Sequence, residues 1–303
     1  MAHSSTYAQQ AFDYADKGNV TDYSDIMTVL LINETPWISV FNKPSGAIDG
    51  TPHNWLTRSY GAASAANAQI DGADAPNAEE NTPTKISNEA QIFTRTVNVG
   101  AVQEAVAHHT YSSELAEQRM IIANRLKRDL DQACLQCSAS AAAASATGAK
   151  FPGFPDYIAT NTCAMSTGGA MTTTIFGTAL QNLVTASGKC PDLCIAPPAE
   201  RQEISLLYTR TVNDNITKVS TGNVQIIATD FGDVKLAWDT HCCANTVALI
   251  NTDAWDLKYL RGKNWQKKRL AEAGFYTKEA IMGVFLQICY NESANYWFTQ
   301  VST

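Results

Sequence analysis

The strongest periodic pattern in the chain lies between residues 113 and 137. Apolar side chains recur there every three or four positions, and charged side chains fill the positions between them, which predicts an amphipathic helix. Ser113 is a suitable N-cap, and Glu114 and Glu117 follow in the first turn, where the helix dipole favours acidic side chains. At about 1.5 Å per residue this helix would be roughly 35–40 Å long, which indicates a strut along one side of the fold.

A period of two residues predicts strands on both sides of a long polar segment. Residues 53–60 form a candidate strand, and residues 91–99 form a clearer one because apolar and polar residues alternate. Between them, residues 61–85 are small or polar, and Ile70 is the only large aliphatic side chain. A compact domain rarely contains so long a loop, and an isolated two-stranded hairpin is marginally stable. We therefore expect a protruding hairpin that rests on a partner subunit.

The second half of the chain predicts an α/β region that returns to strands. Residues 138–174 are expected to form a loop, because Ala, Ser, Thr and Gly dominate them. The strand at residues 282–290 is apolar on both faces and should be central and covered. The remaining elements are expected to be helices at 176–184, with Gly188 as the stop, and from Pro198 to Tyr208, and strands at 192–196, 224–227, 234–239 and 247–250.

The first 45 residues are typical of an arm. Ser24 can cap a short helix, and Pro36 is expected to end it. The start of the chain has neither a basic region nor an apolar run, so we expect no signal peptide and synthesis in the cytoplasm. No stretch approaches the roughly 18 consecutive apolar residues of a membrane span, so no membrane partner is expected.

Composition favours a protein with permanent partners. Hydrophobic residues make up 45% of the chain, enough for a sizeable core, whereas charged residues make up only 17%. Obligate interfaces are depleted in charge, so this composition is typical of a subunit in an assembly. The net charge of −7 argues against a sequence-specific nucleic-acid binder, although a container for nucleic acid needs no base contacts.

Catalytic motifs are missing from the sequence. It contains no GxSxG, HExxH or phosphate-binding GxxxxGK[ST] pattern. His241 and Cys242 are adjacent, and in an extended chain their side chains would point in opposite directions, so they cannot form a catalytic dyad. We therefore expect no catalytic residues and no cofactor.

The eight cysteines do not form a metal-binding pattern either. Cys134 and Cys137 make a CxxC, but both fall on one face of the predicted helix, whereas zinc knuckles occur at turns. We expect buried free thiols and no metal site. The sequence leaves undecided whether Cys190, Cys194, Cys242 and Cys243 form disulfides later, because a protein that leaves the cytoplasm meets oxidising surroundings.

One basic cluster has three interpretations. It consists of Lys258, Arg261, Lys263, Lys267, Lys268 and Arg269. It can be a solvated face, a contact with an acidic patch on a neighbouring subunit, or a salt-sensitive contact with DNA phosphates. The matching acidic patch lies in the expected hairpin and consists of Asp71, Asp74, Glu79 and Glu80.

The order of these parts resembles the Hong Kong 97-like fold of tailed-phage major capsid proteins. Several short stretches are similar to one branch of that group, the major head proteins related to that of phage SU-ten. Their order and spacing, from about residue 25 to the end, carry the resemblance. The stretches are residues 33–38, 65–68 with 71–75, 83–88, 103–106, 126–129 and 229–232.

The resemblance implies an α+β fold made of named parts. These are an N-terminal arm (1–45), an extended loop formed by a long β-hairpin (46–90), a peripheral domain (91–154 and 251–303) whose spine helix is 113–137, and an α/β axial domain (155–250). The extended loop would lie over an adjacent subunit, and the arm would reach across neighbours. Expected contacts between subunits are therefore Trp37, the acidic hairpin residues and Lys263, Lys267, Lys268 and Arg269.

The implied function is a structural one. The chain would assemble into pentamers and hexamers of an icosahedral head that encloses double-stranded DNA, with only non-specific DNA contact. A separate scaffolding protein, a portal protein and a decoration protein are the other expected partners, and the mature location is the virion. Two alternatives are an encapsulin-like compartment with a protein cargo and, from another class, an α/β enzyme with residues 61–85 as a lid.

Overall fold

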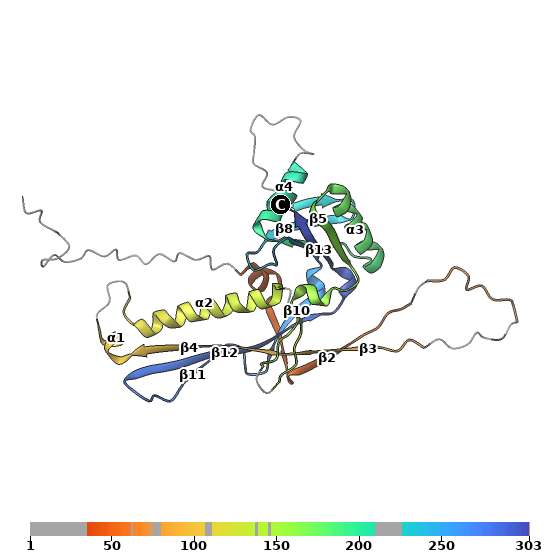
Figure 1. Cartoon of the computed structure of the whole chain (residues 1–303). Helices are drawn as coiled ribbons and strands as arrows, with labels where there is room; N and C mark the ends of the chain where they lie inside the picture. The colour runs from red at the N-terminus through yellow and green to blue at the C-terminus, as the bar shows by residue number, and fades with distance from the viewer. Residues whose placement is uncertain are drawn as a thin grey trace, which may run out of the picture.

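The computed structural model describes residues 35–61, 63–72, 74, 80–106, 111–136, 139–144, 147–209 and 226–302. These residues form an elongated lower layer of strands with one long helix, a more compact upper part, and a hairpin that projects to one side (Figure 1). Helices and strands are mixed as the predicted α+β class requires. The short helix that Ser24 was expected to cap lies outside the described residues.

The lower layer is a five-stranded sheet built around β12 (Tyr276–Cys289). Along one edge β12 pairs antiparallel with β4 (Gln91–Gly100), and along the other with β10 (Trp255–Leu260) and β11 (Gln266–Arg269). β1 (Pro44–Ile48) adds parallel to β10. The expectation that the late apolar strand is central is confirmed, because its last seven residues are all buried.

The long helix α2 (Glu114–Leu135) lies along β4 and β12. The Ser113 side chain accepts a hydrogen bond from the backbone N–H of Ala116, as expected of an N-cap. The helix buries one stripe that includes Leu126, Leu130 and Cys134. The predicted helix is thus confirmed, and its 22 residues give a length of about 33 Å. The short helix α1 (Ala101–Ala105) follows β4 directly.

The upper part is a six-stranded mixed sheet with two helices. Its strand order is β5-β13-β9-β6-β8-β7, and β6 and β9 are buried at every position. The elements are β5 (Thr162–Ala170), α3 (Thr173–Ser187), β6 (Leu193–Ala196), α4 (Pro198–Thr209), β7 (Ile226–Thr229), β8 (Gly232–Trp238), β9 (Thr246–Ile250) and β13 (Tyr296–Ser302). Gly188 ends α3 with a φ of 69°, the left-handed conformation expected of a glycine stop.

Two strands of this sheet differ from the expectations. β5 lies inside the segment predicted to be a loop, because its small and hydroxyl-bearing residues hide a strand that pairs parallel with β13. β13 belongs to the last segment of the chain, yet it pairs with β5 and β9 of the upper sheet. The final strand therefore crosses back from the lower layer, a long-range pairing that no local pattern reveals. The division into peripheral and axial domains stays a prediction.

The projecting hairpin consists of β2 (Pro52–Thr57) and β3 (Thr84–Glu89). The prediction of a hairpin here was right, but its returning strand was wrong: β3 pairs with β2, and β4 pairs with β12 instead. The sequence of β3 is mostly polar because the hairpin has little core to face, and only Trp55 of its two strands is buried. The hairpin therefore gains little stability from its own side chains.

An aromatic cluster joins the two sheets. Trp37, on the short π-helix η1 (Trp37–Phe41), contacts Phe154 and Trp255 edge-on, with ring centroids 6.3 and 6.0 Å apart. Phe154 also packs on Trp297 of the upper sheet. Pro36 is the N-cap residue of η1, and the preceding helix that this proline was expected to end lies outside the described residues. Three further single turns connect strands, η2 (Phe154–Tyr157), η3 (Thr252–Ala254) and η4 (Glu292–Ala294).

Six cysteines of the described residues are free thiols, and three of them, Cys134, Cys194 and Cys289, are buried as expected. Cys134, Cys163, Cys190, Cys194, Cys242 and Cys289 are free. Cys243 is an exception, because it takes part in a disulfide. Among the described helices, none is long and apolar enough to cross a membrane.

Candidate functional site

Four basic side chains follow one edge of the lower sheet. Lys267, Lys268 and Arg269 on β11 are exposed, and Lys263 just before the strand is half-buried. We call these four residues the basic edge. Arg269 forms an ion pair with Glu272 at 2.6 Å, and the Lys263 ammonium donates to the Gln266 side chain at 3.1 Å. All four β11 residues are exposed, as is typical of an edge strand protected by charge.

The basic edge lies near an ion pair between α2 and β12. The Arg119 guanidinium donates to both carboxylate oxygens of Glu279 at 2.6 and 2.7 Å. This guanidinium holds the pKa of Glu279 below its usual range, and Lys267 and Arg269 act in the same direction. Lys268 alternates to the other face of β11 and lacks this role.

The acidic residues lie at the opposite end of the molecule. Asp71, Asp74 and Glu80 are exposed in the loop between β2 and β3, and we call them the acidic tip. Glu79, which the sequence grouped with them, lies outside the described residues. Figure 1 shows the hairpin extending to one side, while β11 lies below the far end of α2. One chain therefore holds the two patches apart.

Trp37 has a different role from the expected one. Its side chain is 0% exposed, and its indole N–H points at the Gln287 side chain at 3.4 Å. A side chain with no surface cannot contact a neighbouring subunit, so the structure places Trp37 in the core of its own chain. The sequence could not show this, because the covering residues Phe154 and Trp255 lie more than 100 positions away.

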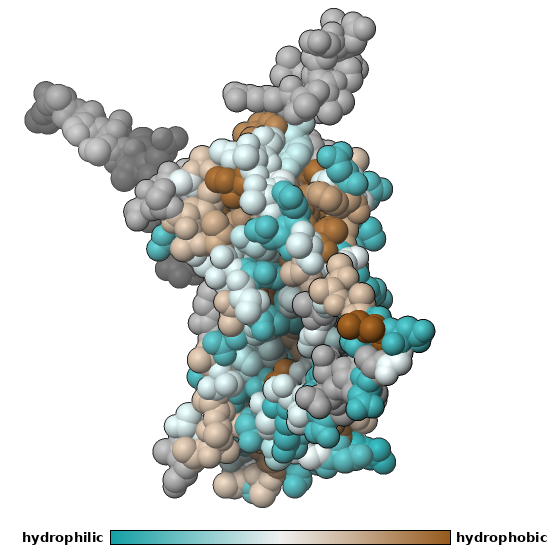
Figure 2. All heavy atoms as spheres, turned by 90° about the vertical axis from the view of Figure 1, so that its right-hand side faces the viewer, coloured by the Kyte–Doolittle hydropathy of each residue, from teal (hydrophilic) through white to brown (hydrophobic). Residues whose placement is uncertain are grey.

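The face at the hairpin end is mostly hydrophilic, with scattered apolar residues (Figure 2). At the base of the hairpin lies a groove of about 1130 Å³ between β2, β3 and the η4 region. Its lining mixes polar and apolar side chains and includes the exposed Leu56 and Tyr60. Neither feature provides a converging set of catalytic groups.

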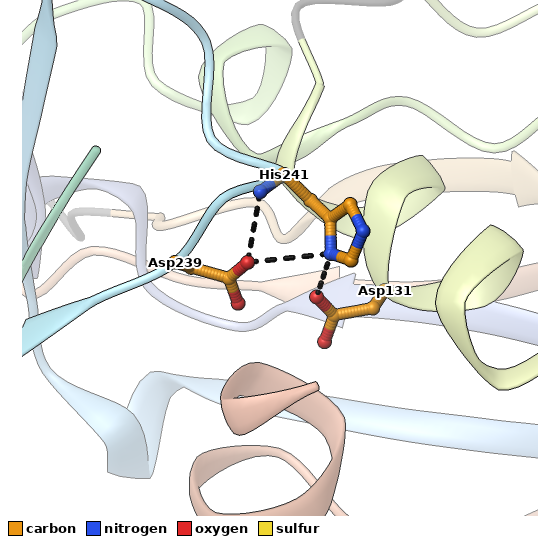
Figure 3. Close-up of side chains that lie close together, drawn as sticks. All are labelled: Asp131, Asp239 and His241. Carbon is orange, nitrogen blue, oxygen red and sulfur yellow. Dashed lines mark hydrogen bonds and ion pairs between the residues drawn. The ribbon is translucent and has the colours of Figure 1, made fainter. Parts of the chain in front are cut away.

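A buried polar cluster joins α2 to the connection between β8 and β9. It consists of Asp131, Asp239 and His241, and we call it the junction cluster (Figure 3). The imidazole Nδ1 lies 2.9 Å from an Asp131 oxygen and 3.3 Å from an Asp239 oxygen. The His241 backbone N–H donates to the same Asp239 oxygen at 2.9 Å. Both carboxylates are fully buried, and the imidazole is 11% exposed.

Burial and hydrogen bonding shift the titration of this cluster. Burial raises the pKa of Asp131, although the hydrogen bond from His241 opposes this. Hydrogen bonds to Asp131 and Asp239 raise the pKa of His241. The neighbouring Cys242 is no candidate nucleophile, since burial raises the pKa of its thiol well above the usual range.

Sequence reasoning missed the junction cluster. One signal was available: Asp131 interrupts the apolar stripe of α2, between Leu130 and Cys134, where a charge needs a partner. His241 was considered only as a partner of Cys242. Its true partners come from a helix 110 positions away and from Asp239 two positions before it.

Comparison with known proteins gives a consistent result. The profile of the family described as SU10 major capsid protein matches residues 5–302. No curated protein sequence matches the chain significantly. Among solved structures, the capsid asymmetric unit of cyanophage A-1(L) is similar with a TM-score of 0.70 at 12% identity, covering 94% of this chain and 98% of the other.

Two further structures have the same fold. A chain from Mycobacterium phage Bobi has a TM-score of 0.61 at 12% identity, covering 94% of this chain and 96% of its own length. A chain of the SrpI encapsulin complex from Synechococcus elongatus has a TM-score of 0.60 at 11% identity, covering 94% and 93%. At these identities the structural likeness shows the Hong Kong 97-like fold, and the family profile supports a capsid protein more than an encapsulin.

Proposed function

The chain belongs to the SU10 major capsid protein family, and from this premise we propose how its surfaces build a shell. It is a capsid-forming structural protein and not an enzyme. The family assignment gives the encapsulin-like alternative less support. The alternative of an α/β enzyme with residues 61–85 as a lid has no support, since the described residues of the acidic tip are exposed and project away from the body.

In the proposed contact, the acidic tip of one subunit lies on the basic edge of its neighbour. The single observation that carries this proposal is the separation of two complementary patches at opposite ends of one chain. Such patches cannot neutralise each other within a subunit, but they can do so between subunits arranged head to tail. A head-to-tail contact whose rotation closes generates a ring.

The charges of the two patches are suited to a contact between exposed groups. Among the described residues, Lys267 and Lys268 form no ion pair within the chain, and neither do the three acids of the tip. Each exposed pair contributes little, on the order of 0.2–1 kcal/mol, but a ring and then a shell repeat it many times. Complementary charge also sets the register of the contact.

The proposed products are pentamers and hexamers that close into an icosahedral head around double-stranded DNA. A weakly charged, acidic subunit suits a container that touches DNA without reading it. A separate scaffolding protein, a portal protein and a decoration protein are proposed as further partners. We place the mature protein in the virion and its synthesis in the cytoplasm of the host bacterium.

The experiment that tests this function is expression of the chain alone, followed by size-exclusion chromatography and negative-stain electron microscopy. Rings, tubes or closed shells are the expected products. The variant Lys268→Glu should reduce assembly, and Asp74→Lys in the same chain should restore it. Lys235→Glu, which makes the same charge change at an exposed site on β8 of the upper part, is the matched control and should assemble normally.

Two outcomes would contradict the proposed contact. Equal assembly of Lys268→Glu and the control would show that the basic edge is merely solvated. Normal ring formation by Lys268→Glu, together with weaker salt-sensitive binding of added double-stranded DNA in a gel-shift assay, would assign the basic edge to DNA. Restoration by the acidic-tip substitution is the result that neither alternative explains.

A further inference from the structure

The junction cluster contains more buried negative charge than the His241 imidazole can neutralise. Two carboxylates share one imidazole nitrogen, and a single Nδ1–H can donate fully to only one of them. Within the described residues, the second oxygen of Asp239 is buried without a hydrogen-bond partner. A buried carboxylate oxygen without a partner is costly, so a cation or a proton is expected beside it.

We propose that the junction cluster binds one divalent transition-metal ion of the zinc class through Asp131, Asp239 and His241. The three ligand atoms all lie within 4.8 Å of one another, and two of the spacings are 2.9 and 3.3 Å. Ligands at about 2.0–2.2 Å from a tetrahedral ion are separated by roughly 3.3–3.5 Å, so the two spacings to the imidazole nitrogen are close to those of a metal site, and the two carboxylates would adjust around the ion. Figure 3 shows both carboxylates directed at the same side of the imidazole.

The chemistry of the donors selects the kind of ion. Imidazole nitrogen suits zinc and its neighbours, while a set of carboxylates alone would suit magnesium or calcium. One nitrogen and two carboxylate oxygens make a mixed set of the type that zinc accepts. The partly exposed imidazole edge gives the ion a path to a site whose carboxylates are otherwise sealed.

The ion would link three segments of the chain that are far apart in the sequence. Asp131 comes from α2, and Asp239 and His241 come from the connection between β8 and β9. The other Asp131 oxygen accepts from the backbone N–H of Ile38 at 3.2 Å, which adds η1. A metal here would therefore fix the long helix, the upper sheet and the start of the described chain relative to one another.

The test uses the purified full-length chain, Zn²⁺ and Co²⁺ as the probes. Dialysis against Zn²⁺ and elemental analysis should give one tightly held ion per chain, and the melting temperature should rise by several degrees. The variant Asp239→Asn, which keeps an oxygen to accept from the His241 N–H, should lose that ion and that rise. His53→Gln removes a histidine far from the cluster and should change neither result.

The Co²⁺ spectrum keeps the proposal falsifiable if Asp239→Asn fails to fold. Bound Co²⁺ should give visible bands of four- or five-coordinate nitrogen and oxygen ligation without a thiolate charge-transfer band. A thiolate band would move the metal to a cysteine and overturn the proposal. So would fewer than one ion per chain, or equal Zn²⁺ binding by Asp239→Asn, and the cluster would then be neutralised by a proton.

Discussion

Single residues at the junction between the two sheets have the largest expected effects on stability. Trp37, Phe154 and Trp255 pack on one another there, and the first two are almost completely enclosed. They come from segments that are far apart in the sequence, so their packing holds these segments together. Local signals such as the Ser113 cap and the Gly188 stop were predictable, because their partners lie within four residues. The burial of Trp37 was not, because its partners are distant.

Truncating Trp37 should destabilise the chain strongly. Trp37→Ala removes a fully buried indole and leaves a cavity that its aromatic neighbours fill only in part, so we expect a loss of about 3–5 kcal/mol in the free energy of unfolding. Urea unfolding followed by circular dichroism measures it. Phe275→Ala, at a side chain that is 96% exposed, is the control and should change stability by less than about 0.5 kcal/mol. A change in the free energy of unfolding as small for Trp37→Ala as for the control would place Trp37 at a surface.

Two glycines should respond to alanine in opposite directions. A Cβ at Gly153 would come within 1.7 Å of the Gln136 carbonyl oxygen at the end of α2, so Gly153→Ala must separate these backbones and destabilise the fold. A Cβ at Gly177, on the exposed side of α3, meets nothing within 4 Å. Gly177→Ala should therefore stabilise by about 0.5–1 kcal/mol through helix propensity. Thermal unfolding of both variants checks the signs, and a neutral Gly153→Ala would refute the close approach.

At the scale of elements, α2 is held to the lower sheet by two ion pairs as well as by its apolar stripe. Arg119 pairs with Glu279 of β12, and Arg95 of β4 pairs with Asp129 of the helix at 2.6 Å. Helix α2 and strand β12 were predictable because their patterns are long and regular. Strands β3 and β5 were not, since one is polar and lies on a projecting hairpin and the other is an edge strand of small residues.

The Arg119–Glu279 pair should make stability depend on acid pH. The pKa of Glu279 is lower in the folded chain than the unfolded value of 4.5. Its contribution is therefore complete above that unfolded value and is lost as the pH falls through the folded pKa. Glu279→Gln should lower the free energy of unfolding by about 1–2 kcal/mol near pH 7, a figure kept small because Arg119 is one-third exposed to solvent. In acid the same substitution should lower it by less. Urea unfolding at a series of pH values measures this, and a cost that stays constant into acid would contradict the assignment.

At the scale of the whole molecule, the chain is elongated and carries an acidic patch at one end and a basic patch at the other. Sequence patterns and family resemblance predicted the fold class, the hairpin and both charged patches. They did not predict the junction cluster, because it forms only when α2 meets the connection between β8 and β9. Head-to-tail assembly requires the two patches to lie at opposite ends of the subunit, where Figure 1 shows the hairpin and β11.

Assembly through exposed charges should weaken with salt. Raising the ionic strength from about 0.05 M to about 0.5 M shortens the Debye length to a few ångströms and should slow ring formation. Light scattering during assembly measures the rate. The Lys268→Glu variant should be much less sensitive to salt than the unmodified chain, and equal sensitivity would mean that other charges control assembly.

The central claim is that the acidic tip of one subunit lies on the basic edge of the next within a capsid shell. Electron cryo-microscopy of the assembled particle tests it most directly, because the subunits can be traced individually. The account predicts density for each β2–β3 hairpin over an adjacent subunit, with Asp71 or Asp74 close to Lys267 or Lys268 of that neighbour. A hairpin that folds onto its own subunit, or a tip that contacts the shell away from β11, would contradict it.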